Sequence, residues 1–289
     1  MDSFDLHFHS TYSDGKKTVA ELAKEIKKQK LKYCALTDHN TVDGIRELKA
    51  GLVKSGIQVI HGVELTTKYG DDEVHVLAYD FDIDAAAKVV RERNELVRVQ
   101  KLEEMTSAIA LSVAEGFEVT AGLVPVEKQP VTLTLALDIC ARASNQALFK
   151  ERHGKILIPE EVYWEYQAPE KSCAVSRSGV SVEWIVEKFK GVAKDLIIAH
   201  PFVPVSVVVK ALDEARIVDL LGKGLTGVEV YHNKTSADQI KLLKRIVGER
   251  SLHFSGGSDH HGRKDDSLLG QYGPDTPLPD FKLFHFFNR

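Results

Sequence analysis

Short apolar segments alternate with amphipathic segments along the chain, and this alternation sets its class of fold. Residues 4–8 (FDLHF), 32–37 (KYCALT) and 57–65 (IQVIHGVEL) are apolar runs of strand length. Thr18 and Glu21 have the spacing of a capping box, which predicts that a helix begins between the first two runs. This βαβ rhythm predicts an α/β fold with parallel strands and right-handed crossovers.

The rhythm breaks after residue 82 and resumes near residue 179. Residues 83–178 have apolar side chains at helical spacing, and Gly116 is a predicted helix end. We therefore predict one α/β domain, residues 1–82 and 179–289, interrupted by a helical insertion that forms either a lid or an oligomer contact. Helices are predicted at 182–190, around 206–221 and after a cap at Ser236 and Gln239, and strands at 73–79, 196–200, 227–231 and within 252–262.

Composition limits the partners of this chain. With 289 residues, of which 43% are hydrophobic, it can bury a sizeable core. A net charge of −4 and a pI near 6.3 argue against binding long duplex nucleic acid. The three cysteines form no C-x-x-C pair and no apolar run reaches about 18 residues, so we predict a cytoplasmic protein without thiolate metal ligands or membrane segments.

Six of the twelve histidines lie at or just past predicted strand ends, beside Asp or Glu. In the first strand, His7 and His9 are two residues apart and therefore share one face. The carboxyl ends of strands converge in a βα barrel, so we expect these side chains to meet. The candidate metal ligands are His7, His9, Asp14, His39, Glu64, His75, His200, Asp259 and His261.

Imidazole and carboxylate donors without thiolates suit Zn, Mn or Fe, and this number of donors exceeds the needs of one ion. We therefore predict two or three divalent ions. Among the other histidines, His232 is either a substrate contact or a bystander, and His260 is predicted to point away from His261. Structural or surface roles are predicted for His61 inside an apolar strand, His153 in the insertion, and His253 and His285 in segments without acidic partners.

Five motifs carry a resemblance to a known family. They are DLHFHSTYSDG, LTDHNTVDG, HGVEL with EVHVLAY, IIAHP and GSDHHG, in this order along the chain. The sequence resembles the PHP (polymerase and histidinol phosphatase) domain, and the motifs cover the chain outside the insertion. The resemblance implies a distorted (β/α)7 barrel, in two parts around the insertion, with a trinuclear metal site.

The resemblance also divides the ligands among three ions. In this division, Asp14, His39 and His261 would hold the third ion. Asp38 would not bind an ion but would orient the imidazole of a ligand. The first ion would be held by His7, His9, Glu64 and Asp259, and the second by Glu64 as a bridge with His75 and His200.

Within the family, the chain is similar to the nucleoside 3',5'-bisphosphate phosphatases and the 5'-to-3' exoribonucleases of short RNA. The SDG turn, the TDHNT motif and the insertion before AHP carry this similarity. The segment FVPV after AHP lacks the arginines of that branch. Arg142, Arg177 and Arg263 are the candidate replacements for binding a substrate phosphate.

The predicted activity is hydrolysis of phosphate monoesters of nucleotides or short oligonucleotides. In this hypothesis a hydroxide that bridges two ions attacks phosphorus, and His232 protonates the leaving oxygen. If His200 is not a ligand, it is the alternative proton donor. Two other functions stay open: a phosphatase of histidinol phosphate or another small metabolite phosphate, and a non-catalytic metal-binding regulatory module.

Overall fold

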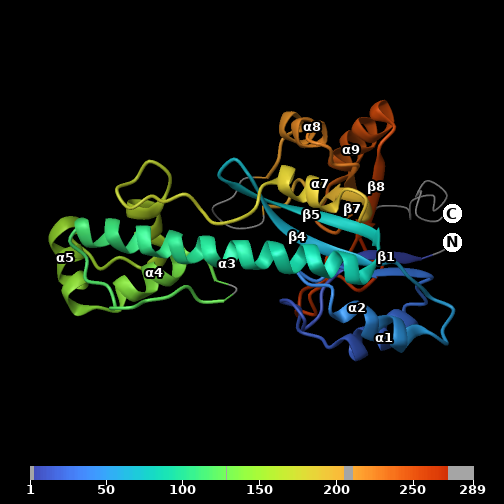
Figure 1. Cartoon of the computed structure of the whole chain (residues 1–289), viewed down its shortest axis with the longest axis horizontal. Coiled ribbons are helices and arrows are strands. Elements are labelled where there is room, and N and C mark those ends of the chain that lie inside the picture. Colours follow the sequence, from blue (N-terminus) through green and yellow to red (C-terminus); the bar gives the residue numbers. More distant parts are fainter. Residues whose placement is uncertain (1–2, 128, 205–210, 273–289) are drawn as a thin grey trace. The chain divides into compact units, whose positions relative to one another are not determined.

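The computed structural model describes residues 3–127, 129–204 and 211–272. These residues divide into two compact units (Figure 1). We call Met1–Arg93 with Val180–Arg289 the strand unit, and Asn94–Gly179 the helical unit. The helical unit begins later than the start predicted for the insertion, at residue 83, because helix α3 (Ile83–Ala114) contributes to both units.

The first sheet of the strand unit is parallel, as the sequence predicts. Its three strands are ordered β1-β2-β3, and both pairs are parallel. The predicted capping box is confirmed: the Thr18 hydroxyl accepts a hydrogen bond from the Glu21 amide, and the Glu21 carboxylate accepts one from the Thr18 amide. The elements are β1 (Phe4–Phe8), α1 (Val19–Lys28), β2 (Tyr33–Leu36), α2 (Gly44–Leu52) and β3 (Gln58–Val59).

The second sheet is mixed, which corrects the expectation of parallel strands throughout. Its order is β4-β5-β6-β7-β8, and β5 is antiparallel to both of its neighbours. The turn between β4 and β5 is only two residues long and contains Gly70 with φ of 63°, whereas a parallel pair needs a crossover of a dozen residues or more. The strands are β4 (Gly62–Tyr69), β5 (Asp72–Phe81), β6 (Ala193–Ile198), β7 (Gly227–His232) and β8 (His253–Gly257).

The mixed α/β class is confirmed, but the closed (β/α)7 barrel is not. Among the described residues no continuous ladder closes the strands into a barrel, and single bridges join the two sheets at Phe8 with His260 and at His39 with Glu64. The run predicted as one strand at 57–65 is β3 and β4 with a break between them. These bridges place the end of β1 beside the segment that follows β8, and the segment that follows β2 beside the first residues of β4.

Three helices of the strand unit belong to its second half, and Figure 1 shows them beside the β4–β8 sheet. Helix α9 begins with the predicted cap, in which Ser236 and Gln239 bond reciprocally. The predicted helix at 206–221 is observed as α8 from Glu214, while 205–210 lie outside the described residues. The helices are α7 (Val182–Phe189), α8 (Glu214–Gly222) and α9 (Ala237–Arg250).

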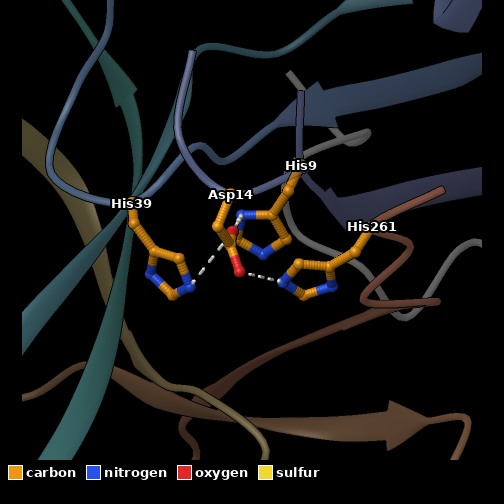
Figure 2. A group of neighbouring side chains, drawn as sticks. All are labelled: His9, Asp14, His39 and His261. Atoms are coloured by element: carbon orange, nitrogen blue, oxygen red, sulfur yellow. Dashed lines mark ion pairs between the residues drawn. The ribbon is translucent and has the colours of Figure 1, made fainter. Parts of the chain in front are cut away.

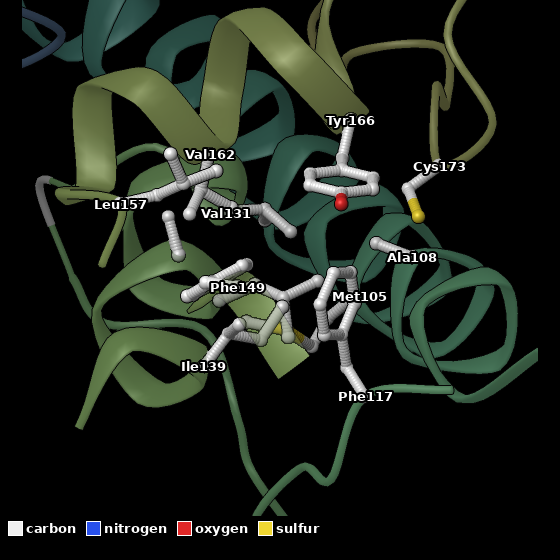
Figure 3. Packing of buried hydrophobic residues seen from close by; sticks show 12 residues of the cluster. Met105, Ala108, Phe117, Val131, Ile139, Phe149, Leu157, Val162, Tyr166 and Cys173 are labelled. Atoms are coloured by element: carbon white, nitrogen blue, oxygen red, sulfur yellow. The ribbon is translucent and has the colours of Figure 1, made fainter. Parts of the chain in front are cut away.

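The helical unit has its own apolar core (Figure 3). Phe149 is fully buried there, and the rings of Phe117 and Tyr166 meet edge to face with centroids 4.9 Å apart. Helix α3 stops at Ala114, and Gly116 follows with φ of 97°, in agreement with the predicted helix end. The other elements are α4 (Val131–Cys140), α5 (Ala143–His153), α6 (Pro159–Val162) and the π-helical turn η1 (Tyr163–Gln167).

A membrane-crossing helix would need both length and an uninterrupted apolar character. Within the described ranges no helix, including the 32-residue α3, meets both conditions.

Candidate metal centre

The first strand directs two imidazoles toward one carboxylate. His7 lies in β1 and His9 directly follows it, and both side chains are fully buried. The Nε2 atom of each ring lies 3.2 Å from Oε2 of Glu64 in β4. The alternation of a strand therefore brings these two side chains to one side, as predicted.

The predicted ligands gather into three overlapping groups. In each group, the candidate donor atoms lie within 4.8 Å of one another. The geometry differs from the predicted division in that His9 and His39 belong to two groups each. Among the described residues His200 belongs to none of the groups, although its Nε2 lies 3.0 Å from Oε1 of Glu64. The groups are His7, His9, Glu64 and Asp259; His39, Glu64 and His75; and His9, Asp14, His39 and His261.

Figure 2 shows the carboxylate of Asp14 among the imidazoles of His9, His39 and His261. The closest approach is 3.3 Å, between Oδ2 of Asp14 and Nε2 of His261. The side chain of Asp14 is 40% exposed, whereas that of His9 is fully buried. This group therefore lies on the accessible side of the cluster.

Unpartnered buried atoms test whether the cluster fits metal ions. Among the described residues, Nε2 of His7 and both ring nitrogens of His9 have no hydrogen-bond partner, and the same holds for Oε2 of Glu64. Two donors about 2.1 Å from a tetrahedral ion are about 3.4 Å apart, close to the 3.2 Å observed between these atoms. Buried polar atoms are costly without partners, so this arrangement fits divalent cations. The ligand roles themselves stay predictions.

Charge within the cluster shifts several pKa values strongly. Burial by itself would lower the pKa of His9 and His75, but the facing carboxylates raise these values to about 9 and about 10. Burial lowers the pKa of His39 to about 3. Burial opposes ionisation of Glu64 and Asp259, yet the imidazoles hold both pKa values well below their usual range. Protons therefore balance the carboxylates here, and metal ions would displace those protons.

Asp38 has a different role from the predicted one. Its carboxylate accepts hydrogen bonds from the amide and hydroxyl of Ser10, at 2.7 and 2.6 Å, and from the Ser13 hydroxyl at 2.6 Å. We expected it to orient an imidazole, whereas the hydrogen bonds observed in the described part of the chain connect it to residues 10–13, which follow β1. Asp38 instead holds the loop that carries Asp14.

Two buried carboxylates near the cluster were missed by sequence analysis. Asp5 accepts hydrogen bonds from the amide and hydroxyl of Ser258, next to Asp259. Glu229 in β7 lies 2.9 Å from Nδ1 of His7. Both are acidic residues inside otherwise apolar strands, which is the signal that could have identified them.

The structure brings His232 to the cluster. The ring is fully buried, with Nε2 3.4 Å from Oδ2 of Asp259 and Nδ1 accepting the amide hydrogen of Lys234 at 3.1 Å. His260 bonds other groups: its Nδ1 bonds the carbonyl oxygen of Ser267 at 2.8 Å, and its Nε2 faces Lys17.

The remaining histidines lie in other settings. His253, predicted to have a structural or surface role, bonds the buried carboxylate of Asp195 through Nδ1 although its own segment offers no acidic partner. His61 lies between β3 and β4 rather than inside a strand. His153 bonds the Tyr166 hydroxyl within the helical unit. His285 lies outside the described residues.

One of the three candidate arginines lies at the cluster. Nη2 of Arg263 is 3.0 Å from Oδ2 of Asp14, and the Arg263 side chain is 54% exposed. Arg142 and Arg177 belong to the helical unit. There Arg142 pairs with Asp138, and Arg177 lies over the Tyr163 ring.

Buried imidazoles and carboxylates that converge at strand ends are typical of metal-dependent hydrolases. The particular family follows from comparison: the PHP domain model matches residues 5–167. The chain therefore belongs to the PHP family, and the prediction of a PHP-family hydrolase is confirmed.

Two curated relatives span nearly the whole chain. The 3',5'-nucleoside bisphosphate phosphatase of Chromobacterium violaceum is 27% identical over 267 residues, covering 90% of this chain and 88% of that protein. The 5'-3' exoribonuclease of Haemophilus influenzae is 28% identical over 258 residues, covering 89% of each chain. These similarities agree with the predicted branch of the family.

A solved structure supports the fold. An amidohydrolase from Chromobacterium violaceum, with bound sulfate and no metal, is 25% identical with a TM-score of 0.60, and the match covers 95% of this chain and 92% of that one.

Proposed function

We propose that this chain is a metal-dependent phosphoesterase that removes phosphate from nucleotides or short oligonucleotides. The observation that carries the proposal is the set of buried nitrogen and oxygen atoms that face one another around Glu64 without hydrogen bonds. The phosphatase and exoribonuclease relatives, each aligned over about nine-tenths of the chain, support the substrate class. The distorted (β/α)7 barrel and the identity of the metal, Mn, Fe or Zn, are part of this proposal.

The residues divide by position into three sets of ligands. His39 would also be a ligand of the second ion, and His9 of the third, because each of these residues belongs to two of the groups of neighbouring donor atoms. When bound, divalent cations in such a site activate water near neutral pH and neutralise phosphoryl oxygens. The sets are His7, His9, Glu64 and Asp259 for the first ion; Glu64, His75 and His200 for the second; and Asp14, His39 and His261 for the third.

His232 would supply a proton to the leaving oxygen. Because its Nδ1 accepts the Lys234 amide hydrogen, the neutral ring has its proton on Nε2, the atom on the Asp259 side. Nε2 is therefore the donating atom in this proposal.

Arg263 would bind the phosphate of the substrate. Its guanidinium pairs with Asp14 on the accessible side of the cluster, and one edge of a guanidinium can bind two phosphate oxygens. The turn that carries it is fixed, because the Asp266 carboxylate accepts hydrogen bonds from the amides of His261 and Arg263. Phosphate roles for Arg142 and Arg177, and the lid role of the helical unit, stay predictions.

Phosphate release with Mn²⁺ supplied tests the function. Adenosine 3',5'-bisphosphate, AMP, a 5'-phosphorylated RNA trimer and histidinol phosphate are compared in one assay. We expect preferred turnover of the bisphosphate or the trimer. Turnover of histidinol phosphate alone would support the small-metabolite phosphatase instead. A chain that binds metal and hydrolyses none of them would support the regulatory module.

The Arg263 role is tested by Arg263→Ala and Arg263→Lys. A lost charge-assisted contact to phosphate is worth about 1.5–3 kcal/mol, so we expect kcat/KM to fall about 10- to 100-fold for Ala, with partial recovery for Lys. Arg245→Ala is the matched control, because Arg245 is also about half exposed in the strand unit and also pairs with a carboxylate, that of Glu214. Equal kinetics of Arg263→Ala and the unchanged protein would remove Arg263 from the site.

A further inference from the structure

We infer that Glu229 is a positioning residue that fixes two predicted metal ligands, His7 and His200, at the same time. This rests on the proposed metal centre and adds to it a residue that lies outside every group of candidate ligands found in the described chain. Glu229 would act on the metal through these two histidines and would not touch the ion.

The geometry places Glu229 between two strand ends. Glu229 lies in β7, and its side chain is fully buried. Oε1 lies 2.9 Å from Nδ1 of His7 in β1. Oε2 accepts a hydrogen bond from the backbone amide of His200, which follows β6, at 2.7 Å. One carboxylate thus connects ligands from two different strands.

The contact to His7 selects one ring nitrogen for the metal. A carboxylate at Nδ1 accepts a hydrogen bond and keeps the proton on that atom. Nε2 is then the atom with a free lone pair, and it is the atom that faces Glu64 and Asp259 at 3.2 and 3.5 Å. The hydrogen bond also fixes the plane of the ring.

The contact to His200 holds an unusual backbone. His200 has φ of 25°, in the left-handed region that residues other than glycine rarely adopt. Such a conformation persists only where the surroundings enforce it. The Glu229 oxygen, bonded to the amide of this residue, is one of those constraints, and the imidazole so placed has Nε2 3.0 Å from Glu64.

If Glu229 served only the stability of the fold, its hydrogen bonds would be expected to go to residues other than the predicted ligands. Burial of a carboxylate without partners costs several kcal/mol, so it needs hydrogen bonds. Within the described part of the chain, both hydrogen bonds of this carboxylate go to predicted ligands. Asp195 provides the contrast: it is equally buried in the neighbouring β6, and it bonds His253, which belongs to no ligand group among the described residues.

The first test compares Glu229→Gln with Asp195→Asn as the matched control. Both exchange a fully buried carboxylate for an amide of the same shape. An amide has one accepting oxygen, so the side chain introduced by Glu229→Gln cannot accept from both His7 and the His200 amide. We expect Mn²⁺ affinity, measured by titration calorimetry, to fall about 10- to 100-fold in Glu229→Gln and to stay unchanged in Asp195→Asn. Equal affinities for Glu229→Gln and the unchanged protein would overturn the inference.

The second test needs no variant and therefore does not depend on the folding of Glu229→Gln. Long-range ¹⁵N–¹H spectra of the zinc-loaded chain report which nitrogen of His7 bears the proton. We expect the proton on Nδ1 and zinc on Nε2. Zinc bound at Nδ1 of His7 would overturn the inference. Neither readout uses a phosphate ester, so inactivity on every ester with both results as expected would refute only the proposed function.

Discussion

Both units bury an apolar core, and within the described part of the chain the strand unit alone also buries a cluster of imidazoles and carboxylates. The strand unit places imidazoles and carboxylates such as His7, His9 and Glu64 at the ends of its strands, with almost no exposed area. The helical unit buries Phe117, Phe149 and other apolar groups around its helices. Apolar burial stabilises a fold directly, whereas buried charges need partners and contribute little net stability.

The two kinds of buried group are expected to contribute to different properties, the charged cluster to function and the apolar cores to stability. A cluster of buried charges that balance one another is retained for its chemistry, because apolar residues would stabilise the same space better. Changes in the strand-unit cluster should therefore alter metal binding and pH dependence. Changes in the helical-unit core should alter stability alone. The two tryptophans make this testable, since Trp184 lies in the strand unit and Trp164 in the helical unit.

The largest expected effect comes from Glu64→Gln. The two Glu64 oxygens face five imidazoles, and a neutral amide can neither bridge two cations nor accept at all of these contacts. We expect phosphate release to fall below detection and bound metal, measured by elemental analysis, to decrease. The contacts are to His7, His9, His39, His75 and His200.

A folded Glu64→Gln protein with normal metal content and turnover would show that the strand-unit cluster does not bind the metal. Circular dichroism at the assay pH serves as its folding control.

The next effect concerns the pH dependence of the metal-free strand unit. The pKa of His9 rises from 6.5 to about 9 on folding, and that of His75 from 6.5 to about 10. Between pH 6.5 and 9 the folded state therefore binds more protons, and the free energy of unfolding falls as pH rises, by about 1.4 kcal/mol per pH unit for each imidazole. Below pH 6.5 this contribution is fully present. Urea unfolding followed by Trp184 fluorescence in Trp164→Phe measures it.

Metal should reverse this trend, because ligand imidazoles must be deprotonated. The Trp164 signal in Trp184→Phe is expected to change less over the same range, since it reports the apolar core. Strand-unit stability that rises with pH in the absence of metal would contradict the assignment of charge in the cluster.

The smallest effect on metal binding is expected from Phe149→Ala, which acts on the helical unit. Deletion of a fully buried phenyl ring costs about 3–5 kcal/mol through lost burial and the cavity left behind. The Trp164 unfolding transition in urea should shift by this amount, while Mn²⁺ affinity from calorimetry stays constant. A weakened metal affinity in Phe149→Ala would show that metal binding in the strand unit depends on the packing of the helical unit.

Sequence reasoning succeeded where the signal is local. The capping boxes at Thr18 and Ser236 depend on residues three apart, and the shared face of His7 and His9 depends on residues two apart. It failed for β5 because the apolar pattern of a strand does not show whether the strand runs parallel or antiparallel to its neighbour. The signal that could have shown this is the short turn at Gly70, which joins β4 to β5.

The sequence by itself therefore determined the order of strands and helices, the donor types and the family motifs, because each depends on neighbours along the chain. The tertiary structure alone decided which donors share a group and which carboxylates support them. His7 and Glu229 are 222 residues apart, and Arg263 and Asp14 are 249 apart. Their contacts exist only because distant strand ends are brought together by the sheets, and no local spacing records which ends will meet.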